Sequence, residues 1–141
     1  MSDFLFDTCL LSELIKPTPN RNVELWAKSV DPMASFLSAM SIGEVRKGIE
    51  RRPHDARRAF LENWLSVDVP NAFRGRVLAF GSEVADLYGR IKAKADSNGR
   101  VVGVPDAIIA ATALHYNLSV VTRNAGDFEP LGVSVVNPWL S

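Results

Sequence analysis

The 141 residues are 47% hydrophobic and 23% charged, the size and composition of one globular domain, here residues 1–141. Sixteen basic residues balance sixteen acidic ones, which excludes a general electrostatic attraction to nucleic acid for the chain as a whole. A single cysteine excludes an internal disulfide, and no apolar run approaches the ~18 residues of a membrane span. The first residues also lack the pattern of a secretory signal, so we expect a cytoplasmic protein.

Apolar periodicity predicts strands and helices that alternate along the chain. A strand over residues 3–6 precedes a helix over 8–16, and a second helix follows two prolines at 20–30. The remaining elements are a strand at 34–40, helices at 41–52 and 54–65, a strand at 76–80, helices at 81–99 and 105–114, and strands at 118–122 and 133–136. Val- and Leu-rich strands separated by helices predict an α/β fold, a three-layer α/β/α sandwich around a central parallel sheet.

The helix that starts at "VPDAIIAATAL" is apolar or small on nearly every face, which predicts that it is buried. It nevertheless begins with Asp106, although an unpaired buried charge is costly. A structural role through the helix dipole would also place an acid there. The alternative is that Asp106 faces an enclosed cleft where a cation matches its charge.

Three further acids follow strands or start helices, and each has an ordinary structural interpretation. Asp7 after the first strand could cap a helix, and Asp127 in "TRNAGDF" could serve a turn. Glu44 could pair with Lys47 on a helix surface. Together with Asp106, however, they would meet at one edge of a parallel sheet, where ligands collect.

Four carboxylates close together repel one another unless a cation lies among them. Oxygen ligands without a paired His or Cys favour Mg²⁺ or Mn²⁺ over zinc. One or two such ions activate water and stabilise charge on a phosphodiester. The hypothesis from these residues is metal-dependent hydrolysis at Asp7, Glu44, Asp106 and Asp127.

Basic residues gather in two stretches, "RKGIERRPHDARR" at 46–58 and "GRIKAKADSNGR" at 89–100. Solvated helix faces with ion pairs are the usual explanation of such runs. A surface for a phosphate backbone or an acidic partner is the alternative, and Arg51 and Arg52 are its candidates in the first stretch.

The segments "FDTCLLSELIK", "LSAMSIGEVRKGIE" and "VPDAIIAATALHYNLSVVTRNAGDFEPLGVSVVNPW" resemble, in order, the motifs of the PIN domain of VapC toxins, especially the FitB-like branch. The resemblance implies a Mg²⁺-dependent endoribonuclease, the toxin of a type II toxin–antitoxin pair. It also implies a homodimer silenced by a VapB- or FitA-like antitoxin, which alone contacts operator DNA. The catalytic, metal-binding acids it implies are again Asp7, Glu44, Asp106 and Asp127, and its supporting polar residues are Thr8, Ser41, Thr122 and Asn124.

Two positions depart from the family pattern, because Cys9 replaces the usual Asn and Val104 offers Asp106 no polar neighbour. Two other functions remain open. A PIN fold without catalysis would act as a binding module. A phosphoacceptor receiver domain is also small and acidic at strand ends, but it needs paired acids after the first strand, where Asp7 stands alone.

Overall fold

The computed structural model describes residues 3–140 and contains a five-stranded, all-parallel sheet in the order β3-β2-β1-β4-β5. The central strand β1 pairs on both sides, with Leu5 opposite Phe36 of β2 and Val120 of β4. The strands are β1 (Asp3–Phe6), β2 (Ser35–Ser38), β3 (Val77–Leu78), β4 (Leu118–Val121) and β5 (Val135–Val136). The predicted parallel sheet is confirmed.

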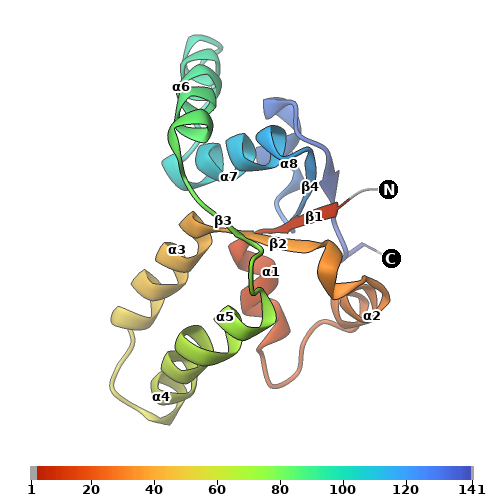
Figure 1. Cartoon of the computed structure of the whole chain (residues 1–141), viewed down its shortest axis with the longest axis vertical. Coiled ribbons are helices and arrows are strands. Elements are labelled where there is room, and N and C mark those ends of the chain that lie inside the picture. The colour runs from red at the N-terminus through yellow and green to blue at the C-terminus, as the bar shows by residue number, and fades with distance from the viewer. Residues whose placement is uncertain (1–2, 141) are drawn as a thin grey trace.

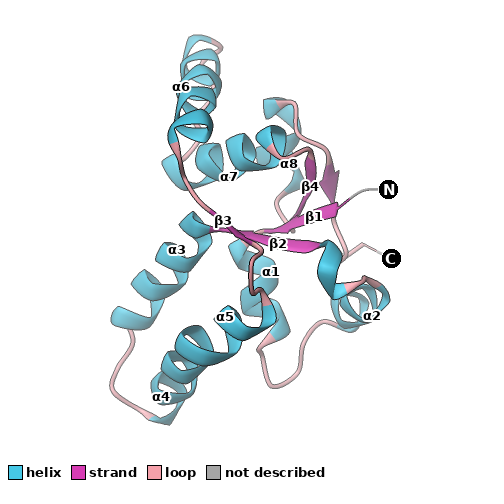
Figure 2. Ribbon diagram, viewed as in Figure 1, coloured by secondary structure: helices cyan, strands magenta, loops and turns pink. Residues whose placement is uncertain are grey.

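Helices cover both faces of the sheet, as the α/β/α prediction requires (Figure 1). Helices α1, α2 and α5 pack on one face, and α7 packs on the other with α6 against its outer side. The helices are α1 (Thr8–Leu14), α2 (Arg21–Ser29), α3 (Ala39–Glu50), α4 (Ala56–Asn63), α5 (Val69–Ala72), α6 (Ser82–Ser97), α7 (Val104–His115) and α8 (Ala125–Phe128), with short helical turns η1 (Pro32–Ala34), η2 (Trp64–Asp68) and η3 (Glu129–Leu131). Figure 2 shows the short strands at the centre of this helical shell.

Alternating residues of β1 divide the core into two halves. Leu5 packs with Ile109 of α7, whereas Phe6 packs with Leu10 of α1 on the opposite face. This follows from the two-residue period of a strand. Helix α7 is buried from Ala107 to Ala113, as its composition predicts. Within residues 3–140, no helix is long and apolar enough to cross a membrane.

Several element boundaries differ from the sequence-based prediction, including those of β2, α4 and β3. Strand β2 ends at Ser38 instead of residue 40, because the Ser38 hydroxyl caps α3 by accepting the Met40 N–H at 3.0 Å. The helix predicted at 54–65 is shorter as α4 and continues through the π-helical turn η2 into α5. Pro70 has no N–H for the carbonyl four residues earlier, which favours this irregular turn. Strand β3 keeps only two of the five predicted residues.

Candidate functional site

Asp7 directly follows the central strand β1, at the carboxyl edge of the sheet. From β1 the sheet continues through β2 to β3 on one side, and from β4 it continues to β5 on the other, so the topological switch point lies between the ends of β1 and β4. Ligands of open α/β sheets bind at such a switch point. The position of Asp7 therefore comes from the strand order and not only from its helix-capping role.

The carboxylate of Asp7 is buried and fixed by hydrogen bonds on both oxygens. Its Oδ1 accepts the Thr8 N–H at 2.8 Å, and its Oδ2 accepts the Thr122 hydroxyl at 2.8 Å. Thr122 follows β4 and is fully buried, and its Oγ1 also accepts the Asn124 N–H at 3.0 Å. Asn124 thus contributes its backbone, while its side chain stays exposed at the start of α8.

Glu44 lies on α3, half-buried, and faces the first turn of α1. The Thr8 hydroxyl donates to Glu44 Oε1 at 2.8 Å. Since Thr8 also donates its N–H to Asp7, one residue orients two of the candidate acids. The alternative pairing of Glu44 with Lys47 is absent from the ion pairs of residues 3–140.

Ser41 lies one turn before Glu44 and is fully buried. Among the described residues its hydroxyl has no hydrogen-bond partner. A buried hydroxyl without a partner is uncommon in folded proteins. Ser41 therefore remains the one supporting residue that this structure leaves without a defined contact.

Asp106 lies in the first turn of α7 and is half-buried. Burial, followed by the negative charges of Asp7, Glu44 and Asp127, raises its pKa from the ordinary 3.8 to about 6. Asp127 itself is exposed on α8. The structure thus brings all four candidate acids into one electrostatic neighbourhood. We call these residues the acidic cluster: Asp7, Glu44, Asp106 and Asp127.

Cys9 occupies the space beside Asp7 where the family pattern has Asn. Its Sγ lies 3.5 Å from Asp7 Oδ2 and 3.5 Å from Thr122 Oγ1. Burial, followed by the charge of Asp7, raises the pKa of the Cys9 thiol. The thiol therefore keeps its proton and can donate weakly to the carboxylate, in the manner of the missing amide. Val104, the second departure, is 48% exposed and provides only apolar surface before Asp106.

The acidic cluster has the donor chemistry of a Mg²⁺ or Mn²⁺ site, since all its ligating atoms are carboxylate oxygens. The side chains do not form a closed set of ligands as they stand: within residues 3–140, no three His, Cys, Asp or Glu side chains are placed so that they could hold a metal ion. Repulsion among the unneutralised carboxylates favours such separation. A cation would remove that repulsion.

A hollow of about 240 Å³ begins at Thr8 and Glu44 and extends between α1, α3 and α4. Ile49, Leu61 and Trp64 give it apolar walls. Its lining is spread over residues 8–64, so no local motif in the sequence marks it. Glu44 of the acidic cluster therefore borders a partly apolar hollow, which the sequence analysis did not predict.

Residues 4–131 match the model of the family described as the PIN domain. The chain belongs to the PIN-domain family.

Full-length relatives place this PIN domain in the FitB-like branch of VapC toxins. It is 36% identical to the VapC ribonuclease Y4jK of Sinorhizobium fredii over 135 residues, or 96% of each chain. It is 35% identical to toxin FitB of Neisseria gonorrhoeae, over 96% of this chain and 97% of FitB. The solved structure of FitAB bound to a DNA fragment superposes with a TM-score of 0.91 at 33% identity, covering 98% of this chain and 96% of that chain.

Proposed function

We propose that this PIN domain is a Mg²⁺-dependent endoribonuclease that acts as the toxin of a type II toxin–antitoxin pair. The observation that carries the proposal is the electrostatic coupling of Asp106 with Asp7, Glu44 and Asp127 at the switch point of the sheet. The names of the relatives, a VapC ribonuclease and a toxin, support the same activity.

Asp7, Glu44, Asp106 and Asp127 would hold the ion, with Mn²⁺ as a substitute for Mg²⁺. The bound metal supplies an activated water and stabilises charge on the phosphodiester. The donor set fits this role, because carboxylate oxygens are the ligands that Mg²⁺ prefers and a cation would offset the negative charges that raise the pKa of Asp106.

The other residues of the site prepare the carboxylates for this role. Thr8 orients Asp7 through its N–H and Glu44 through its hydroxyl, and Thr122 fixes the second oxygen of Asp7. These hydrogen bonds hold oxygen atoms in place before any ligand arrives, which lowers the cost of organising the site. Burial and the neighbouring negative charges raise the pKa of Asp106 to about 6, so without a bound cation its carboxyl group holds a proton more tightly than an exposed aspartate does.

The proposal includes partners. The structure of FitAB on DNA contains a FitB relative of this chain with its FitA partner, which supports a FitA- or VapB-like antitoxin for this protein. Contact with operator DNA would then run through the antitoxin. We also propose that the protein forms a homodimer, cleaves RNA and acts in the cytoplasm.

The test is cleavage of pooled cellular RNA by purified protein without antitoxin, in Mg²⁺, in Mn²⁺ and with a chelator. Asp7→Asn should abolish cleavage, whereas Asp86→Asn, at an exposed acid of α6 paired with Arg90, should leave it intact. Cleavage that persists in chelator, or in Asp7→Asn, would disprove the mechanism. An inactive wild-type protein that still binds RNA would support the binding-module alternative.

A further inference from the structure

The basic residues of the stretch at 89–100 do not form one surface. Arg90 pairs with Asp86 at 3.1 Å and Lys92 pairs with Asp96 at 2.8 Å, each one turn along α6. Lys94 and Arg100, by contrast, form no ion pair with any residue between 3 and 140. Two cations of this stretch are therefore neutralised by local acids, and two are not.

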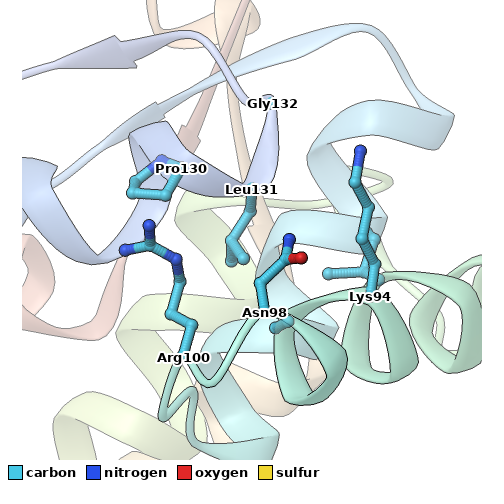
Figure 3. A pocket seen from close by; sticks show the side chains of 8 residues that line it. Lys94, Asn98, Arg100, Pro130, Leu131 and Gly132 are labelled. Carbon is cyan, nitrogen blue, oxygen red and sulfur yellow. The ribbon is translucent and has the colours of Figure 1, made fainter.

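Lys94 and Arg100 line the same hollow, of about 140 Å³, between the end of α6 and the turn η3. In Figure 3, Arg100 extends towards Pro130 and Asn98 lies beside Leu131, whereas Lys94 extends from α6 on the other side of Leu131. No acidic residue lines this space. Its lining residues, which we call the basic hollow, are Ile91, Lys94, Ala95, Asn98, Arg100, Pro130, Leu131 and Gly132.

The basic hollow borders the segments that carry two residues of the acidic cluster. Arg100 precedes Asp106 by six residues, and Pro130 follows Asp127 by three. Leu131, in the lining of the hollow, packs with the buried cluster that contains Ala107, the residue next to Asp106. The hollow therefore lies beside the first turn of α7.

We propose that the basic hollow is a phosphate subsite that binds the backbone of single-stranded RNA next to the acidic cluster. This inference rests on the proposed nuclease function. Arg100 offers a planar pair of donors suited to phosphate, Lys94 offers a compact charge, and the Asn98 amide adds neutral donors. The two cations also offset the repulsion that the acidic cluster exerts on a polyanion.

The size of the basic hollow favours RNA over an acidic protein segment as its occupant. Its 140 Å³ corresponds to roughly five water molecules, which is room for a phosphate group. A protein partner needs an interface of about 800 Å² on each side to bind stably. A phosphodiester needs only the few directed donors that this hollow provides.

The test is binding of a labelled, mixed-sequence, single-stranded RNA, measured by fluorescence anisotropy in chelator at several salt concentrations. The double variant Lys94→Ala/Arg100→Ala is compared with Arg90→Ala/Lys92→Ala, which removes the same charge from two ion-paired positions on α6. We expect the first to weaken binding about 10-fold and to lower the salt slope by about 1 to 1.5, because each phosphate contact contributes about 0.7. The matched control should change neither quantity.

Several outcomes would overturn the subsite. One is an equal loss of RNA binding in both double variants, and another is no loss in the Lys94/Arg100 variant. A third is an acidic polypeptide that binds more tightly than RNA and depends on the same two residues. Arg90, Lys94 and Arg100 are exposed and Lys92 is only partly buried, so the variants should keep an unfolding temperature close to that of the wild type.

Cleavage assays separate this inference from the proposed function. Wild-type protein that cleaves RNA while the Lys94/Arg100 variant binds it normally would overturn the subsite and leave the nuclease standing. RNA binding that depends on Lys94 and Arg100, without cleavage in any metal, would overturn the nuclease and leave the subsite standing.

Discussion

The acidic cluster and the hairpin of α3 and α4 use charge in opposite ways. In the hairpin, Arg46 lies 2.8 Å from Glu62 and Arg58 lies 2.7 Å from Glu50, so opposite charges neutralise one another. In the acidic cluster, burial and the charges of the neighbouring carboxylates raise the pKa of Asp106 to about 6. Paired charges need no functional explanation, whereas unpaired like charges cost stability and indicate a ligand.

This contrast decides between the two interpretations of the basic stretch at 46–58. Arg46 and Arg58 belong to the ion pairs of the hairpin, and Arg57 donates to the Ile15 carbonyl and stacks on Phe60. The ordinary interpretation, helix faces with ion pairs, holds for these residues. Arg51 and Arg52 form no ion pair within the described chain and stay candidates for a partner surface.

The largest expected effect is on the rate of RNA cleavage, which should depend on the acidic cluster and not on the hairpin. Replacing any member of the acidic cluster by its amide should lower the cleavage rate at least about 100-fold, because each contributes to electrostatic stabilisation at the reacting phosphate. Glu62→Gln in the hairpin should change the rate by less than about 2-fold. The measurement is the initial rate of RNA cleavage in Mg²⁺. Comparable losses of rate in the cluster variants and in Glu62→Gln would contradict a special role for the acidic cluster.

The hydrogen bonds of Thr122 beside the acidic cluster should contribute to the free energy of unfolding. Thr122→Val removes the hydroxyl that donates to Asp7 and accepts from Asn124, so it should lower the free energy of unfolding by about 1–3 kcal/mol. Chemical denaturation checks this value. Thr122→Ser keeps the hydroxyl and should retain the hydrogen bonds, so an equal loss in both variants would assign the effect to packing.

Repulsion in the acidic cluster predicts that Asp106→Asn stabilises the metal-free protein. The folded pKa of about 6 exceeds the ordinary 3.8, so the folded state binds a proton more tightly than the unfolded state. Ionisation of Asp106 therefore costs stability increasingly between about pH 4 and pH 6, and fully above that range. A pKa rise from 3.8 to about 6 corresponds to roughly 3 kcal/mol. Because Asp106 is partly exposed and solvent screens its charge, the gain above pH 6 should be about 1–2 kcal/mol.

Denaturation of wild type and Asp106→Asn in chelator, at pH 4 and pH 7.5, measures this gain. The difference should vanish at pH 4. Adding Mg²⁺ should stabilise the wild type more than the variant, since the ion replaces the missing positive charge. A variant that is less stable than wild type at pH 7.5 would show that Asp106 serves α7 structurally instead.

The smallest effect belongs to the ion pairs of the hairpin. Arg46 and Glu62 are each 38% exposed, so solvent screens their attraction. Glu62→Gln should shift the unfolding temperature by less than about 2 °C, and less still at high salt. A thermal scan at two salt concentrations is sufficient, and a large shift would mean that the pair organises the hairpin.

The sequence determined the fold class and the identity of the candidate acids. Strands without alternation, such as "LSVV" at 118–121, are buried on both faces, and this burial is visible in their composition. The burial of α7 and the acid in its first turn could also be predicted from the sequence, because both depend only on the residues of that one helix. The short extent of β3 and the π-helical turn before α5 depend on packing and on Pro70, so periodicity alone misplaced them.

Only the tertiary structure decided which groups share a neighbourhood. Thr8 reaches Glu44 across 36 positions, and Thr122 reaches Asp7 across 115, because the strand order brings the ends of β1 and β4 together. The same is true of the cation Arg46, which reaches Glu62 across 16 positions because α3 and α4 fold against each other. Residue chemistry is local and can be read along a chain, whereas the pairing of charges depends on distances that only the folded chain defines.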